Sequence, residues 1–265
     1  MELIKSISEM KAASMRARSS RESVGLVPTM GYFHEGHLSL VRIGRKACDF
    51  LVVSIFVNPA QFGEDEDYES YPRDIDRDLQ FLKKESVDAA FLPEVEEMYP
   101  EGFATHVDVE SLGSVLCGSS RPGHFSGVAT VVMKLLNIVR PDFAIFGEKD
   151  FQQAVVVRRM VSDLNLDTEI VTAPTVREQD GLAMSSRNSY LNEEERRDAV
   201  ILYRSLLEGR KMVASGTADA SRVRLGVRKM IEEKKTAAVD YVSVVHPETL
   251  RELERIDGEA VIAVA

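Results

Sequence analysis

Two histidines, His34 and His37, lie three residues apart in the segment PTMGYFHEGH, residues 28–37. That spacing lets both side chains share one face of a helix. Two imidazoles beside bound phosphate oxygens could donate hydrogen bonds as negative charge moves to a leaving group. The pair could also be exposed polar residues or half of a metal site, but the other cysteines and histidines are scattered and none has a zinc spacing. We therefore predict a phosphate site.

The elements around the two histidines explain why phosphate would bind there. The apolar residues 24–27 predict a buried strand, and residues 38–43 have the periodicity of a helix. The first turn of a helix leaves backbone N–H groups unpaired and carries partial positive charge, so it attracts phosphate. Gly31 and Gly36 let the backbone approach a ligand closely. The phosphate site is therefore predicted at a strand–turn–helix junction.

A second charged turn, GEKD at residues 147–150, follows the apolar residues 143–146 and precedes a helical pattern. Open α/β folds bind ligands at the carboxyl edge of the sheet, where such a turn would lie. Lys149 could pair with triphosphate oxygens, and Asp150 could orient a metal or a ribose. A charged turn of this kind is also common as a solvated helix cap, and the residues alone leave that alternative open.

A third group, MSSRN at residues 184–188, supplies hydroxyl groups from Ser185 and Ser186 and a guanidinium from Arg187. These donors suit a pyrophosphate that gains charge as it leaves. The group follows a hinge signal at residues 180–181. It is therefore a candidate mobile clamp, although its composition is also ordinary for a loop.

Uncharged amides lie near two of the predicted strand ends, at Gln61 and Gln153. Each could bond a small hydroxy acid without adding charge, though a single glutamine is more often simply exposed. The acidic residues 64–67 could touch Mg²⁺ or form a solvated loop. Arg121 and His124 would contribute only if their turn faces the ligand cleft.

Buried strands alternate with helices over the first two thirds of the chain. In addition to residues 24–27, the predicted strands are residues 50–57, 89–92, 105–109, 143–146 and 170–171. The predicted helices are residues 2–18, 38–48, 73–84, 124–139 and 147–164. Strands separated by helices of this length form βαβ units with right-handed crossovers. The predicted fold class is α/β, with a Rossmann-like, doubly wound parallel sheet.

The chain changes character at about residue 173. Two charged helices are predicted near residues 192–214 and 217–234, and strands near 239–245 and 259–265. We therefore predict two domains. We expect residues 1–174 to form a Rossmann-like domain that carries the catalytic site, and residues 175–265 to form a smaller α+β C-terminal domain with the role of a lid.

The composition limits the class of partner. The chain has 265 residues, 44% of them hydrophobic and 29% charged, which is ordinary for a folded protein of two domains. A net charge of −10 argues against binding to nucleic acid or an anionic membrane, which reward clustered lysine and arginine. Two cysteines give no disulfide framework. The first twenty residues lack the continuous apolar core of a signal peptide, and no later apolar run reaches the length of a membrane span. We expect a cytoplasmic protein that binds small molecules.

The motifs together resemble those of one family. The segments PTMGYFHEGHLSLV, SIFVNPAQF, YPRD, RPGHFSGVATVV, FGEKDFQQ and PTVREQDGLAMSSRN occur in that order within residues 24–190. They resemble the pantothenate synthetase (pantoate–β-alanine ligase) family of nucleotidyltransferases with a His-x-Gly-His signature. The resemblance implies that ATP and (R)-pantoate give pantoyl adenylate and pyrophosphate, and that the amine of β-alanine then displaces AMP. Residues 191–265 match the family only loosely.

The same resemblance implies roles for individual residues. Those that would bind ATP are Met30, Gly31, His34, His37, Gly147, Glu148, Lys149, Asp150, Val176, Met184, Ser185, Ser186 and Arg187. The catalytic ones among them would be His34, His37, Lys149, Ser185, Ser186 and Arg187, with His37 as the proton donor. Gln61 and Gln153 would hold pantoate, with Gln61 also near β-alanine. ATP would act together with Mg²⁺, whose ligands stay unassigned.

The resemblance also has consequences for the whole chain. It implies that the first domain binds ATP and pantoate and forms a homodimer. Family members continue beyond the residues that match 260–265, so we expect the second domain to be short or truncated. Two other functions stay open. One is another nucleotidyltransferase of this architecture that accepts a different acid or a phosphorylated alcohol, and the other is a nucleotide-sensing module without turnover.

Overall fold

The computed structural model describes residues 1–265, which divide into two units. The first unit contains Met1–Gly113 and Arg121–Val176, and the second contains Ser114–Ser120 and Arg177–Ala265. The second unit thus includes a short segment that lies within the predicted first domain. The main division falls between Val176 and Arg177.

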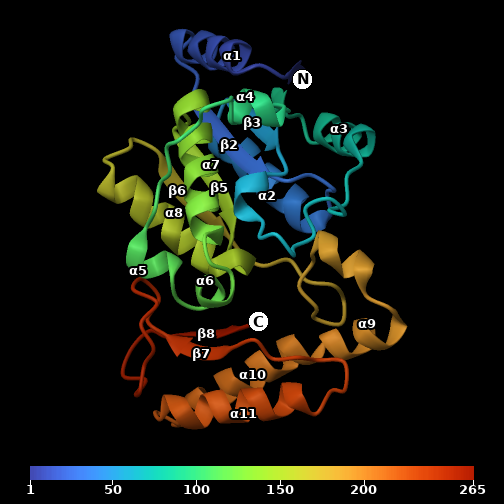
Figure 1. Ribbon diagram of the computed structural model, residues 1–265, viewed down its shortest axis with the longest axis vertical. Coiled ribbons are helices and arrows are strands. Elements are labelled where there is room, and N and C mark those ends of the chain that lie inside the picture. The colour runs from blue at the N-terminus through green and yellow to red at the C-terminus, as the bar shows by residue number, and fades with distance from the viewer. The chain divides into compact units, whose positions relative to one another are not determined.

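Six parallel strands form the sheet of the first unit in the order β1-β4-β3-β2-β5-β6. Figure 1 labels β3, β2, β5 and β6 of this sheet. Their bounds are β1 Glu2–Ile4, β2 Val24–Thr29, β3 Phe50–Ile55, β4 Ala89–Phe91, β5 Phe143–Gly147 and β6 Glu169–Ala173. Apolar residues fill β2 and β3, which are buried in the middle of the sheet. From β2 the chain adds β3 and β4 on one side, and later β5 and β6 on the other. The predicted doubly wound sheet is confirmed, with its topological switch point between β2 and β5.

Helices cover both faces of this sheet. The longer ones are α1 Ile7–Ser19, α2 Glu35–Ala47, α3 Ile75–Lys84, α7 His124–Val139 and α8 Phe151–Asp163. The short ones are η1 Pro59–Gln61, α4 Val95–Met98, α5 Glu110–Gly113 and η2 Glu148–Asp150. Right-handed crossovers that run in opposite directions lie on opposite faces, so α2 covers one face and α8, packed against α7, covers the other (Figure 1). The core under α2 includes Val27, Val41 and Val53, none of which has exposed surface.

Two predicted elements of the first unit are wrong. Residues 2–18 do not form one helix, because β1 pairs with β4 and α1 begins only at Ile7. The Ser6 hydroxyl caps α1 by accepting the N–H of Glu9. Residues 105–109 form no strand, and the N–H of Val107 donates instead to the Thr130 hydroxyl of α7, at 2.9 Å. Both differences come from contacts with distant segments, which a local pattern of apolar residues does not contain.

The second unit combines helices with a two-stranded antiparallel sheet. Its elements are α6 Cys117–Ser120, η3 Ser186–Tyr190, α9 Glu193–Ala199, α10 Ile201–Ala214, α11 Ala220–Glu232, β7 Val242–Val245 and β8 Val261–Val264. The helix predicted over residues 192–214 is divided at Val200. The core includes Val223, Val227 and Val244, so the predicted smaller α+β C-terminal part is confirmed. In neither unit is a helix both long and apolar enough to cross a membrane.

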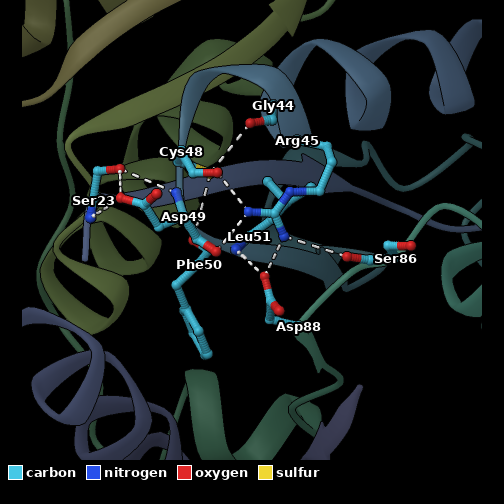
Figure 2. A network of polar contacts seen from close by, with 9 residues as sticks. All are labelled: Ser23, Gly44, Arg45, Cys48, Asp49, Phe50, Leu51, Ser86 and Asp88. Carbon is cyan, nitrogen blue, oxygen red and sulfur yellow. Dashed lines mark hydrogen bonds and ion pairs between the residues drawn. The ribbon is translucent and has the colours of Figure 1, made fainter. Parts of the chain in front are cut away.

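A polar network ties the C-terminal end of α2 to the amino ends of the strands (Figure 2). The Arg45 guanidinium donates to the backbone oxygens of Cys48 and Asp49 and pairs with Asp88. The Asp88 carboxylate also accepts the N–H of Leu51 at 2.7 Å, near the start of β3. Charge-assisted bonds of this kind are strong, so they fix α2 at the end opposite the strand–turn–helix junction.

Candidate functional site

The turn between β2 and α2 has a strained backbone. Gly31 has φ +84° and Tyr32 has φ +52°, both in the left-handed region. Glycine adopts that conformation without steric cost, whereas tyrosine does not. A Cβ added at Gly31 would lie 2.9 Å from Cγ2 of Ile55 and 3.0 Å from Oδ2 of Asp78. The turn therefore needs glycine at position 31 and a supporting contact at position 32.

The two histidines cap the N-terminal end of α2. His34 is the N-cap residue, and its Nδ1 accepts the N–H of Gly36 at 3.1 Å. The N–H of His34 donates to Nδ1 of His37 at 3.4 Å, and the two ring centroids lie 4.1 Å apart. A neutral imidazole has a single N–H, so when both Nδ1 atoms accept hydrogen bonds, each ring carries its proton on Nε2. The backbone thus sets both rings as Nε2–H donors.

The surroundings keep both rings neutral. Burial, and to a smaller extent the charge of Lys149, lowers the pKa of His34 to about 4. Burial, and to a smaller extent the neighbouring His34, lowers the pKa of His37 to about 3. Lys149 lowers and Asp150 raises the pKa of each ring, so these two charges lie within electrostatic reach of both. At neutral pH the pair donates hydrogen bonds without carrying charge.

The second charged turn lies at the end of the neighbouring strand. β5 ends at Gly147, and η2 and α8 follow it. Because β5 pairs in parallel with β2, this turn comes to the same edge of the sheet as the histidines. Nζ of Lys149 lies 3.2 Å from Oδ1 of Asp150, and Glu148, Lys149 and Asp150 are all exposed. The two turns meet at the topological switch point, where open α/β sheets bind ligands.

Gln61 lies beside the first residue of the histidine turn. Its Nε2 donates to Sδ of Met30 at 3.2 Å, and its Oε1 accepts from Nδ2 of Asn58 at 3.1 Å. Asn58 is buried and also donates to the backbone oxygen of Gly127 and accepts the Tyr99 hydroxyl. A buried network therefore holds Gln61 at the same edge as His34 and His37.

Gln153 and Val176 lie on segments of the first unit that reach this edge of the sheet. Gln153 is half-buried in the first turn of α8, shortly after Asp150. Val176 is half-buried beyond the end of β6 and is the last residue of the first unit. Met184, also half-buried, belongs to the second unit.

A hydrogen-bonded chain reaches Gln61 from Arg121 and His124. Arg121 pairs with Glu66 through two contacts of 2.6 Å, and its Nη1 lies 3.1 Å from Nε2 of His124. Arginine only donates, so His124 accepts at Nε2 and donates from Nδ1 to the backbone oxygen of Gln61 at 2.8 Å. Burial lowers the pKa of His124, consistent with a neutral ring. Glu66 thus pairs with Arg121. His124 contacts Gln61 directly, and Arg121 contacts it through His124.

The residues of the predicted clamp belong to the second unit. Arg177 and Ala183 form an isolated antiparallel bridge, and η3 begins at Ser186. Ser185 caps η3, its hydroxyl accepting the N–H of Arg187 at 3.3 Å. Ser185 is half-buried, Ser186 is buried and Arg187 is exposed. One short capped segment therefore carries the predicted donors.

Asp78 is a residue of the first site that no sequence motif singled out. It lies on α3 without exposed surface, and its carboxylate accepts the N–H groups of Tyr32 and Phe33. Burial raises the pKa of this carboxyl. The available signal was an aspartate on the apolar face of the predicted helix, four residues before Leu82, because a carboxylate buried there needs a partner.

Comparison with known proteins finds relatives over the whole chain. The family model described as pantoate-beta-alanine ligase matches residues 2–265. A pantothenate synthetase of Pelotomaculum thermopropionicum is 55% identical over 259 residues, covering 98% of this chain and 92% of that protein. A pantothenate synthetase of Caldicellulosiruptor bescii is 52% identical over 265 residues, covering 100% of this chain and 94% of that protein.

Solved structures extend the likeness to the fold. The crystal structure of pantothenate synthetase from Thermus thermophilus has a TM-score of 0.94 and 48% identity, covering 100% of this chain and 95% of that one. A pantoate-beta-alanine ligase from Francisella tularensis, complexed with beta-gamma ATP and β-alanine, has a TM-score of 0.80 and 30% identity. It covers 100% of this chain and 97% of that one. The likeness thus includes residues 191–265, where the motifs match only loosely.

Proposed function

The chain belongs to the pantoate–β-alanine ligase family, and we propose that it condenses (R)-pantoate with β-alanine while ATP is cleaved to AMP and pyrophosphate. In the first half-reaction the pantoate carboxylate attacks the α-phosphorus of ATP, and pyrophosphate leaves. In the second, the β-alanine amine attacks the acyl carbon of pantoyl adenylate, AMP leaves and the nitrogen loses a proton. The observation that carries the proposal is a pair of neutral imidazoles beside Lys149 and Asp150 at the switch point.

His34 and His37 would supply hydrogen bonds to the phosphates. Their Nδ1 atoms are engaged by the backbone, which leaves the Nε2–H groups for a ligand. A donor aimed at the departing pyrophosphate stabilises the transition state more than the ground state, because negative charge grows there. With a pKa of about 3, His37 is neutral at pH 7. We therefore favour hydrogen-bond donation over the proton donation that the sequence resemblance implies.

The attack brings a carboxylate toward a triphosphate, so positive charge is needed. Lys149 would supply it from the first unit, and Ser185, Ser186 and Arg187 would add donors from the second. Proteins often hold Mg²⁺ through one or two carboxylates together with substrate phosphates, and the exposed carboxylate of Asp150 could serve in this way. Bound Mg²⁺ would neutralise phosphate charge.

Gln61 and Gln153 would hold pantoate. An amide both donates and accepts, so it can bond a hydroxyl or a carboxylate without adding charge. The contact between Gln61 and Met30 supports a place for the acid next to the histidine turn. The adenylate must then be protected from water, and residues 184–187, with the predicted domain of residues 175–265, would close over it as a lid.

The proposal extends to a cytoplasmic homodimer formed through the first domain, which the family resemblance implies. Light scattering during size-exclusion chromatography should give about twice the chain mass of 29.5 kDa. A monomer at micromolar concentration would contradict this part of the proposal and leave the reaction untouched.

The direct test is to detect pantothenate and AMP after the purified protein is incubated with ATP, Mg²⁺, (R)-pantoate and β-alanine. Isotope exchange between pyrophosphate and ATP should require (R)-pantoate but not β-alanine. Exchange supported by an unrelated acid or a phosphorylated alcohol, and not by pantoate, would indicate another nucleotidyltransferase. ATP binding without AMP formation would indicate a nucleotide-sensing module.

A further inference from the structure

The turn that carries the two histidines is not packed on all sides. A cavity of about 490 Å³ lies beside it, and the residues around this cavity include Gly31, Tyr32, Phe56 and Leu79. Tyr32 nevertheless keeps a left-handed backbone conformation, with φ +52°. A strained conformation persists only where its surroundings over-determine it. Since side-chain packing is incomplete here, directed hydrogen bonds have to hold the turn.

One carboxylate accepts two successive N–H groups of the turn, and the N–H of Gly31 donates separately to the Thr29 hydroxyl at 3.3 Å. Oδ2 of Asp78 accepts the N–H of Tyr32 at 2.6 Å, and Oδ1 accepts the N–H of Phe33 at 2.7 Å. Asp78 has no exposed surface, so water does not compete for these bonds. The neighbouring Arg77 lies over the Tyr32 ring, 5.3 Å from its centroid. Two successive amides are thus fixed to α3 immediately before His34.

The fixed amides determine where the imidazoles point. His34 follows Phe33 directly, and its own N–H sets the tautomer of His37 through the 3.4 Å contact at Nδ1. A shift of the turn would therefore misdirect both Nε2–H groups. Because Asp78 already occupies the N–H groups of Tyr32 and Phe33, these two amides are not part of a phosphate cradle.

We infer that Asp78 is a positioning residue for adenylate formation: it holds the turn that presents His34 and His37 to the triphosphate. This inference rests on the proposed function. It predicts an effect on one half-reaction, because contacts to the departing pyrophosphate matter in the first step and are absent in the second.

The test compares Asp78→Asn with Asp76→Asn. Asparagine at position 78 keeps one acceptor oxygen and places an NH₂ group against the other N–H. Asp76 lies on the same helix and is exposed, so its variant removes the same charge without touching the turn. Single-turnover formation of pantoyl adenylate should fall about 10- to 100-fold in Asp78→Asn. The reaction of supplied pantoyl adenylate with β-alanine should stay within about twofold, and Asp76→Asn should change neither rate.

A second variant and a second measurement test the same role of Asp78. Asp78→Ser, whose hydroxyl accepts one hydrogen bond, is assayed in parallel and should show the same selective loss. In hydrogen exchange, the Tyr32 and Phe33 amides should exchange faster in the Asp78 variants than in Asp76→Asn.

Equal losses of rate in both half-reactions would mean that Asp78 has a general structural role, and this result would overturn the inference. No loss of rate in either half-reaction would mean that the turn holds itself without Asp78, and this result would overturn it as well. If the wild-type protein makes no adenylate, the proposed function fails instead, and hydrogen exchange still decides whether Asp78 holds the turn.

Discussion

At the scale of single residues, His37 combines two roles that substitution can separate. Its Nδ1 accepts the N–H of His34, and its Nε2–H is available to a phosphate. In His37→Gln the side-chain nitrogen lies near the position of Nε2, so a donor remains, whereas His37→Asn keeps an acceptor near Nδ1 and loses that donor. We expect adenylate formation in a single turnover to fall about 100-fold in His37→Asn and about tenfold in His37→Gln. Similar losses in both would favour proton transfer, since neither amide titrates.

The residues of the site can be identified from short sequence motifs, but their geometry depends on contacts between segments far apart in the chain. His34, His37, Lys149 and Asp150 can be found from short motifs that follow apolar strands. The tautomers of the two histidines cannot be predicted in this way, because they depend on contacts with backbone N–H groups. The hydrogen bond from Phe33 to Asp78 cannot be predicted either, because it joins residues 45 positions apart.

At the scale of elements, the close contact of α7 with η1 controls where Gln61 lies. A Cβ added at Gly127 would come 2.1 Å from the backbone oxygen of Ala60 and 2.7 Å from Cα of Gln61. Gly127→Ala must therefore displace η1, and we expect the KM for pantoate to rise about tenfold while the KM for ATP changes less. Steady-state kinetics checks this, with Gly258→Ala as the control because a Cβ there meets nothing within 4 Å. An equal rise in both KM values would mean that η1 does not act through pantoate.

The elements that can be predicted from sequence are those with a local pattern of their own. The runs of apolar residues in β3 and β5 are sufficient to identify them as buried strands, and the helix predicted over residues 124–139 has the bounds of α7. The three-residue β1 has no pattern of its own and exists through its pairing with β4. The approach of α7 to η1 is likewise a tertiary contact, visible in sequence only as a glycine within a helix.

At the scale of the whole molecule, the half-buried, neutral histidines link stability to pH. The unfolded chain binds protons at histidine below about pH 6.5, whereas the folded pKa values of His34 and His37 are about 4 and 3. The unfolded state therefore binds more protons, and stability is fully present above pH 6.5 and falls as the pH drops toward 3. Between pH 7 and 5 we expect the free energy of unfolding, from urea titration followed by circular dichroism, to fall by roughly 2 kcal/mol after allowing for partial exposure of the rings.

Other groups change the same curve, so the comparison has to isolate the pair. The pKa of Asp78 is raised by burial, so this group acts in the opposite direction, and the lowered pKa values of Glu66 and Asp180 take effect only at lower pH. The pKa of His124 is lowered by burial, so this ring acts in the same direction as the pair and contributes equally in the wild-type protein and the variant. The double variant with His34→Gln and His37→Gln leaves these carboxylates in place and should flatten the slope between pH 7 and 5. ATP provides a second check, because its negative charge favours protonated rings. Bound ATP should therefore stabilise the wild-type protein more at pH 5.5 than at pH 7.5, and this difference should be larger than in the double variant. Equal slopes in the two proteins would show that the imidazoles are not kept neutral by the fold.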